Sequence, residues 1–362
     1  MSEFIVDKIT NRDGSSGTKI AGISTFSGTS GMQLPSGPIE YRGGRGRGII
    51  AGGYNYPSGQ LNIIQKIEIA STGNAIDFGD MISDRYSGGG VASSVRGFVV
   101  GGRKEASPQP DYLLKTQSIV FSSGGGATYW GDLNDAGTGV RSVSNNIRGL
   151  VMGGHPSSPT GPNSNSINVI DYFTLATQGS ASSFGDLTKY VYAGGMAGSP
   201  TRGLYAGGQT NPYFNSPSYV KTKGIDYSTF ATKGNAIRFG ELSLSLRAIS
   251  GASSATRAVF AGGYDAAPIA YNVGSNQISY VTIASEGNGS DFGDLSMSTS
   301  YATSVSNSVR GVFGHGPNAP THTNAMNYVT IATTGNAIDF GDMTTKVFES
   351  TQNVSDAHGG IG

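Results

Sequence analysis

One segment recurs six times along the chain and constrains its fold more than any other feature. It reads Arg, a small residue, two apolar residues, any residue and a Gly-rich pair, and an aromatic-Gly-acid triplet follows each copy. A period of 48 to 55 residues with glycines at fixed places is typical of a propeller or a solenoid. The segments begin at Arg47, Arg96, Arg148, Arg202, Arg257 and Arg310, and the triplets end at Asp80, Asp132, Asp186, Glu241, Asp294 and Asp342.

The spacing within the repeat shows which part of it varies in length. From the triplet acid to the next Arg there are 16 residues in every case, as from Asp80 to Arg96. From each Arg to the acid that follows, the separation varies from 32 to 39 residues. The extra residues fall between the Gly-Gly pair and the third β-prone stretch, and a connection that tolerates insertion is expected on the surface. Six such loops are expected on one face of a ring.

Each repeat divides into four short β-prone stretches separated by turn residues. In the second repeat these are residues 86–94, 97–100, 116–121 and 127–133. No stretch shows a sustained helical period. The first stretch of each repeat consists mostly of small residues, which suits an innermost strand beside a narrow channel. The triplet aromatics, such as Phe184, are expected to wedge between neighbouring blades, where burial of each contributes roughly 1.5–3 kcal/mol.

The end of the chain indicates that the ring closes on itself. Residues 347–357 look like one further first strand, whereas Arg47 opens the first repeat without one. Pairing these two parts would cover edges that otherwise stay open. We therefore predict an all-β, six-bladed propeller with four short antiparallel strands per blade, in which a C-terminal strand closes the first blade.

Composition excludes several classes of protein. The 57 glycines are spread through the repeat rather than gathered in a tract, so disorder is a poor interpretation. Net charge is zero and no block of Lys or Arg occurs, so nucleic acid is not an expected partner. Cysteine is absent, which excludes disulfides and thiolate sites. No secretory signal is visible and no apolar stretch approaches the length of a membrane span.

The order of these features resembles the kelch repeat over about residues 41–362, although Phe replaces the usual Trp except at Trp130. Ile170-Asp171-Tyr172 stands where kelch blades carry a third-strand Tyr. The phrase Thr-Gly-Asn-Ala-Ile-Asp-Phe-Gly-Asp-Met, at residues 72–81 and again at 334–343, is similar to kelch-like virion proteins of tailed phages that infect marine cyanobacteria. The opening Val-Asp-Lys-Ile-Thr-Asn of residues 6–11 resembles the N-termini of their fibre and appendage proteins. The resemblance implies a structural protein of the virion, assembled in the host cytoplasm and associated with the tail or neck.

Residues 1–40 differ from the ring and contain β-prone pieces between Gly, Ser and Thr turns. Their interpretation as an arm that docks on other virion proteins or forms a trimer or higher ring depends on the resemblance. The alternative is a leader that is disordered or packs on the ring. We therefore expect two parts, an N-terminal arm of residues 1–40 and a propeller of residues 41–362.

Catalytic and metal sites find little support in the sequence. Six copies of the Arg and of the acid indicate structural roles, because an active site is normally one constellation. We expect no cofactor and no resident metal, although His315 and His322 lie seven residues apart in one loop and leave a weak metal site open. No phosphate-binding loop or nucleophile elbow occurs. A carboxylate pair for glycoside hydrolysis stays open, because its geometry is invisible in a sequence.

The variable loops hold the better candidates for ligand binding. Tyrosine beside Asn, Asp and Arg suits saccharide recognition, because the ring stacks on apolar sugar faces while polar groups bond hydroxyls. The alternative is that these side chains merely pack the loops. The candidate residues are Tyr54, Tyr56, Tyr112, His155, Tyr213, Phe214, Tyr264, Tyr271 and His315.

The leading functional hypothesis is a non-enzymatic phage appendage whose loops bind a host-surface ligand, with a glycan favoured over a protein. Many copies per particle would offset weak affinity at a single site. The second hypothesis is architectural, with the ring binding other capsid, neck or tail proteins. The third is a propeller enzyme acting on carbohydrate. A propeller fold by itself does not decide among them.

Overall fold

The computed structural model describes residues 26–27, 31–32, 46–55, 58–105, 111–135, 137–156, 166–210, 220–264, 274–316, 323–347, 349 and 353–361. Every regular element in these ranges is a β-strand, and none of them forms a helix able to cross a membrane. Contacts divide the chain into two compact units, Met1–Gly43 and Gly44–Gly362. The first unit contains β1 (Phe26–Ser27) paired with β2 (Gly31–Met32). The rest of the predicted arm of residues 1–40 lies outside the described residues.

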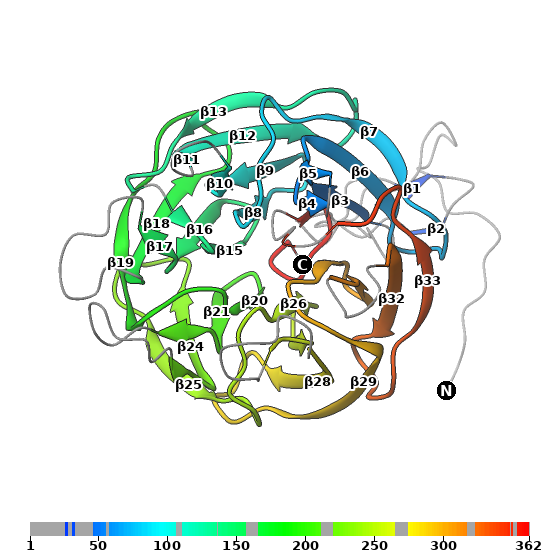
Figure 1. Cartoon of the computed structure of the whole chain (residues 1–362). Helices are drawn as coiled ribbons and strands as arrows, with labels where there is room; N and C mark the ends of the chain where they lie inside the picture. Colours follow the sequence, from blue (N-terminus) through cyan, green and yellow to red (C-terminus); the bar gives the residue numbers. More distant parts are fainter. Residues whose placement is uncertain are drawn as a thin grey trace, which may run out of the picture. The chain divides into compact units, whose positions relative to one another are not determined.

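The second unit is a six-bladed propeller, as predicted (Figure 1). Each blade is a four-stranded antiparallel sheet whose first strand faces the central channel. From the inside outward the blades are β34 (Val354–Ser355), β3 (Arg47–Ala51), β6 (Ile63–Glu68) and β7 (Ile76–Asp80); β8 (Gly89–Ala92), β9 (Arg96–Val100), β12 (Lys115–Val120) and β13 (Thr128–Asp132); β15 (Arg141–Ser144), β16 (Arg148–Met152), β18 (Ile167–Thr174) and β19 (Ser182–Val191); β20 (Gly195–Gly198), β21 (Arg202–Ala206), β24 (Gly224–Thr229) and β25 (Ile237–Glu241); β26 (Ser250–Ser253), β27 (Arg257–Ala261), β28 (Ser275–Thr282) and β29 (Ser290–Thr299); and β30 (Thr303–Ser306), β31 (Arg310–Gly314), β32 (Ala325–Thr330) and β33 (Ile338–Asp342).

The C-terminal strand closes the first blade, as the sequence predicts. β34 pairs with β3, so that Gly48 lies opposite Ser355. Beyond the strand, the carboxylate of Asp356 accepts the backbone N–H of Arg47 at 2.8 Å. In the second blade Ser93 holds the N–H of Arg96 in the same way, at 3.1 Å. In the first blade this contact joins the C-terminal end of the ring to its beginning. In the second blade the same contact joins residues three positions apart in the chain.

The triplet aromatics pack between blades. Phe184 is buried in a cluster with Leu150 and Ile170 of its own blade and Phe230 of the next. Its ring meets that of Tyr172 edge to face, with centroids 5.8 Å apart. Interiors of this kind are close-packed, so each wedge fixes how one blade sits against its neighbour.

The recurring arginines also join neighbouring blades. Arg148 of the third blade donates from Nη1 to the carbonyl oxygen of Phe230 in the fourth blade, at 2.6 Å. Its guanidinium lies 5.5 Å from the ring centre of Tyr172, within range of a cation–π interaction. Arg310 of the sixth blade donates to Ala70 of the first at 2.7 Å. These contacts support the structural interpretation of the repeated arginines.

The glycine of each triplet is required because the next blade approaches its backbone closely. A Cβ at Gly240 would lie 2.0 Å from the carbonyl oxygen of Gly287, in a turn of the next blade. The same relation joins Gly341 of the sixth blade to Gly73 of the first, at 2.5 Å. Beside the first of these contacts, the N–H of Gly287 donates to the carbonyl of Phe239 at 3.0 Å. The repeated glycines therefore mark contacts between blades.

Candidate functional site

The variable loops leave the ring at the Gly-Gly pairs, on the side that we call the loop face. Gly101 and Gly102 have φ values of +60° and +95°, in a region that residues with a Cβ rarely adopt. Short strands then hold the bases of the loops by backbone hydrogen bonds. They are β4 (Tyr54–Asn55) with β5 (Gly59–Gln60), β10 (Arg103–Lys104) with β11 (Asp111–Tyr112), β14 (Gly137–Thr138) with β17 (His155–Pro156), and β22 (Gln209–Thr210) with β23 (Val220–Lys221).

Aromatic side chains from neighbouring loops meet on this face. Tyr112 of the second blade stacks on His155 of the third, with centroids 6.2 Å apart and planes inclined by 6°. His155 in turn meets Tyr192, at the start of the fourth blade, edge to face at 6.0 Å. Tyr54 packs against Tyr86 at 5.4 Å. The predicted residues Tyr54, Tyr112 and His155 therefore lie half-buried at the bases of the loops, in contact with neighbouring blades.

Arginines alternate with these rings. Arg103 lies over the ring of Tyr86, 4.6 Å from its centre, and pairs with Glu105 at 3.3 Å. The Tyr86 hydroxyl also donates to Glu105. The pKa of Tyr86 is raised, mainly by burial and to a smaller extent by this hydrogen bond. We call the whole set the aromatic belt; its members are Tyr54, Tyr86, Arg103, Tyr112, His155, Tyr192, Arg247 and Tyr264.

Tyr264 lies deeper than the sequence suggests, with only 5% of its surface exposed. Arg247 covers its ring at 5.0 Å and Lys221 of the preceding blade at 5.6 Å. Arg247 also interacts with the side chain of Tyr192. The ring of Tyr264 therefore packs beneath Arg247 and Lys221. A ligand at this point would contact these two cations rather than the ring.

His315 does not face the loops, in contrast to its prediction as a binding residue. It is 1% exposed, and its Nε2 lies 2.8 Å from Oδ1 of Asn327. Burial lowers its pKa, so the ring stays neutral near pH 7. His315 stands in the sixth repeat where the other repeats have the first Gly of the Gly-Gly pair. Its side chain packs inside the sixth blade, against Asn327 of β32.

The remaining predicted residues, Tyr56, Tyr213, Phe214 and Tyr271, lie outside the described residues, as does His322. The possible metal site of His315 and His322 is therefore outside them too. In the ranges that the structure describes, no group of three His, Cys, Asp or Glu side chains lies close enough to hold a metal ion.

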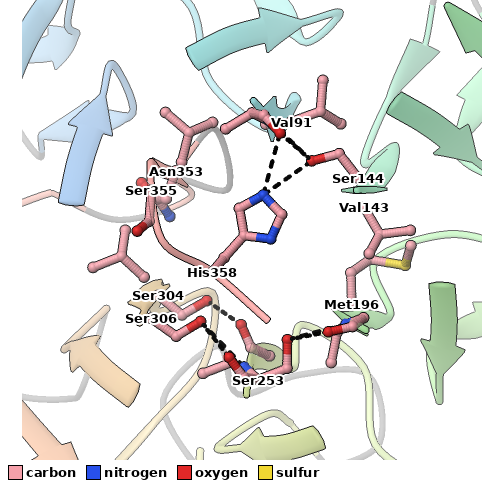
Figure 2. A pocket seen from close by; sticks show the side chains of 18 of the residues that line it. Val91, Val143, Ser144, Met196, Ser253, Ser304, Ser306, Asn353, Ser355 and His358 are labelled. Atoms are coloured by element: carbon pink, nitrogen blue, oxygen red, sulfur yellow. Dashed lines mark hydrogen bonds between the residues drawn. The ribbon is translucent and has the colours of Figure 1, made fainter. Parts of the chain in front are cut away.

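The channel is lined mostly by small residues of the six inner strands, together with valines and Met196. Serine hydroxyls link neighbouring strands there: Ser142 donates to the carbonyl of Gly90 at 2.9 Å, and Ser304 to that of Gly251 at 2.9 Å. Figure 2 shows the ring of His358 reaching into this space from the C-terminal segment. The channel is therefore narrow and polar, and part of it is filled by the protein's own chain.

His358 is held in one tautomer. Its Nδ1 accepts the N–H of Gly360 at 3.0 Å, so the proton is assigned to Nε2. Nε2 donates toward the carbonyl of Ala92 at 3.3 Å and lies 3.2 Å from Oγ of Ser144 (Figure 2). Protein surrounds the imidazole, although part of it still touches the channel space, and this burial lowers its pKa to about 4.

The loop-face mouth of the channel is built on strained backbone. Residues at equivalent places before the inner strands have positive φ, including Ala193 at +56°, Ala248 at +55° and Tyr301 at +51°. Each of these conformations costs roughly 1–3 kcal/mol, and such strain clusters at functional sites. The N–H of Tyr301 donates to the carbonyl of Ala248, and that of Ala248 to Ala193, at 3.0 and 2.6 Å. Hydrogen bonds between blades thus maintain the strained mouth.

Sequence reasoning did not identify the polar side chains at this mouth, chiefly Arg141, Arg247, Tyr301 and Glu349. Arg141 and Tyr301 stand where most blades have small residues, such as Gly89 for Arg141 and Ala248 for Tyr301. That departure from the repeat is the signal that could have located them.

No protein-family model matches the chain, and no curated protein matches it.

Proposed function

We propose that the protein is a non-enzymatic binding module and that the aromatic belt on the loop face is its ligand surface. The single observation that carries this proposal is the contact of Tyr112, His155 and Tyr192 across three successive blades. A surface assembled from several blades presents rings and polar groups at fixed separations, which is what recognition of an extended ligand requires.

A saccharide is the ligand class that this chemistry favours. Half-buried rings such as Tyr54 and Tyr112 offer apolar faces at low entropic cost. Arg103 and Lys104 lie beside them and supply donors for hydroxyl groups. The loop bases are held by backbone pairing, so less ordering is needed when a ligand binds.

The biological setting that we propose is a phage virion. The support is the resemblance of residues 72–81, repeated at 334–343, to virion proteins of cyanobacterial phages. In this setting residues 1–40 attach the protein to a tail, neck or fibre partner, and the ring displays its loop face to a host-surface ligand, preferably a glycan. Many rings on one particle would give useful avidity from weak single contacts.

The test is binding of the full chain, displayed in many copies on beads, to intact marine cyanobacteria and to their isolated surface polysaccharide. We expect saturable binding that falls at least about tenfold for Tyr112→Ala combined with His155→Ala, which is a loss of about 1.4 kcal/mol. The matched control is Tyr129→Ala, because Tyr129 is an exposed tyrosine on the outer strand of the second blade. Absence of binding by the wild-type protein, or an equal loss in the control, would contradict the proposal.

A purely architectural role is the second candidate, and an observation on the opposite face of the ring favours it. Aliphatic side chains are exposed at the tips of the turns that join the first and second strands, namely Val95, Ile147 and Val309. Exposed apolar groups that recur on one face indicate a protein contact. Under this alternative the double substitution on the loop face leaves particle assembly and host binding unchanged, whereas Ile147→Ser weakens incorporation into the particle.

A further inference from the structure

Arg141 stands at a place where the fold requires no arginine. It opens the inner strand β15 and pairs with Met152. In the four other blades whose inner strand is described at this register, the residue is small, namely Gly89, Gly195, Ser250 and Thr303. Four blades thus form without a charge at this position, and the Arg141 side chain is 95% buried, with 5% of its surface exposed.

The Arg141 guanidinium is only partly satisfied by its protein contacts. Nε donates to the carbonyl of Gly194 at 2.6 Å, and Nη1 to that of Val140 at 3.1 Å. A guanidinium carries five N–H donors, and among the described residues no carboxylate lies within 4 Å of it. Burial without an ion pair lowers the pKa of Arg141. Buried charges in proteins are normally paired, because an unpaired one is costly.

Arg85 is a second buried arginine in this ring, and its contacts differ from those of Arg141. It is as deeply buried, at 1% exposed, but its guanidinium donates to three acceptors: the carbonyls of Gly101 and Lys115 and the hydroxyl of Ser83. Arg85 thus finds more acceptors in the protein than the two carbonyls that Arg141 reaches. Among the described residues Arg141 reaches only those two carbonyls, so its remaining donors are available to a ligand.

The space beside Arg141 is the loop-face end of the channel. A cavity of about 80 Å³ lies there, lined by Arg141, Ser142, Met196, Ser250 and Ser304 among others. One water needs roughly 10–15 Å³ of such space, so the cavity has room for one carboxylate, sulfate or phosphate group with a few waters. A whole sugar ring would remain outside, at the belt.

Other groups at the mouth favour an anion. The Tyr205 hydroxyl accepts the N–H of Gly194 at 3.0 Å. The carbonyl of the same residue, Gly194, accepts from Arg141. Burial raises the pKa of Tyr301, so its hydroxyl keeps its proton and can donate. Arg247 adds a second positive charge. The facing acid is Glu349, which accepts from the hydroxyl of Ser87 at 2.6 Å and therefore has a partner of its own.

We propose that the loop-face mouth of the channel binds an oxyanion group of the ligand, with Arg141 as the principal donor and Arg247 and Tyr301 beside it. This deepens the proposed function and rests on it: the glycan is acidic, its charged group enters the channel mouth, and its sugar rings lie on the aromatic belt.

The test is calorimetric titration of the full chain with glucuronate, inorganic sulfate, inorganic phosphate and, as the neutral counterpart, glucose. We expect at least one anion to bind and its affinity to fall at least about tenfold in Arg141→Met, whereas Arg141→Lys loses less because a point charge remains. The matched control Arg238→Gln removes a surface arginine that pairs with Glu241 on an outer strand, and it leaves the affinity unchanged. The preferred anion identifies the acidic group.

Thermal unfolding separates ligand binding from a structural role. Replacing an unpaired buried charge by an apolar residue is often neutral or stabilising, so Arg141→Met keeps or raises the melting midpoint while anion binding falls. A lower midpoint with unchanged anion affinity would show that Arg141 is structural. Tyr301→Phe is a second variant that tests the site if Arg141→Met does not fold, and its anion affinity falls severalfold.

The outcomes distinguish this inference from the proposed function. If the host polysaccharide binds equally to wild type and Arg141→Met, and no simple anion binds through Arg141, the belt retains its role and the anion site is overturned. If simple anions bind through Arg141 but no host polysaccharide does, the anion site is supported and the proposed function fails. No Arg141-dependent binding of any anion up to about 50 mM, an affinity too weak for one good ion pair, overturns the inference.

Discussion

Gly240→Ala tests the contact that spaces the blades. The added Cβ would lie 2.0 Å from the carbonyl oxygen of Gly287 and 2.5 Å from its carbon. These are backbone atoms, so no side chain can swing aside to relieve the overlap. The fifth blade must move away from the fourth, or the strand that contains Gly240 must bend.

The size of the effect follows from the hydrogen bonds that hold this contact. The turn donates from Gly287 to Phe239 and from Gly289 to Glu241, at 3.0 and 2.7 Å. Asn288 accepts the N–H of Glu241 at 3.0 Å. At roughly 0.5–1.5 kcal/mol for each bond, loss of all three lowers the free energy of unfolding by about 2–4 kcal/mol. For a ring of this size that corresponds to a melting midpoint lower by roughly 3–6 °C.

Gly287→Ala is the matched control, because it makes the same chemical change in the same contact. A Cβ at Gly287 meets no atom within 4 Å, so we expect a change below about 1 kcal/mol, in either direction. Both variants would be measured by urea unfolding with tryptophan fluorescence and circular dichroism. If Gly240→Ala lies within 1 kcal/mol of Gly287→Ala, the interpretation of the triplet glycines as spacers between blades is wrong.

Three further perturbations test the packing and the closure of the ring. Phe184→Ala removes a buried wedge between two blades and is expected to lower the free energy of unfolding by about 3–5 kcal/mol; a loss below about 1 kcal/mol would contradict that placement. Asp356→Ala removes the acceptor of the Arg47 N–H and costs about 1–3 kcal/mol in urea unfolding, whereas Asp356→Ser, which copies the second blade, recovers part of it. The pKa of His358 falls from 6.5 to about 4 on folding, so the unfolded chain takes up the proton first; stability is full above pH 6.5 and decreases toward pH 4 by up to about 3 kcal/mol. Unfolding midpoints measured at pH 7, 5.5 and 4 should show a smaller decrease in His358→Gln, and equal decreases would refute the assignment.

The architecture was predictable because the repeat encodes contacts between blades. The Arg, the triplet aromatic and the paired glycines recur since each blade meets its neighbour in the same way, and the described strands match the expected ones within a few residues. The closure differs in detail. From Asp80 to Ser93 there are 13 residues, but from Asp342 to Asp356 there are 14. The residue sixteen positions after Asp342, where the repeat has its Arg, is His358, and the structure places it in the channel because of the one extra residue.

The candidate site was only partly predictable. Tyrosines in the variable loops could be identified by composition, but the burial of Tyr264 depends on cations from two blades that cover it. The side chain of His315 points inward because the residue stands in place of a Gly in the Gly-Gly turn, which a sequence alone does not reveal. Arg141 lies on an inner strand, where the pattern of small residues predicted only a channel wall. Its importance becomes visible once the register aligns it with Gly89 and Gly195.

The most direct test of the account is hydroxyl-radical footprinting of the full chain with and without host surface polysaccharide, read out at individual aromatic side chains. The account predicts that the ligand slows oxidation of Tyr112 and His155 on the loop face and leaves the exposed Tyr129 unchanged. Protection of Tyr129 alone, or no change at Tyr112 and His155 while the polysaccharide is demonstrably bound, would show that the ligand surface lies elsewhere on the ring.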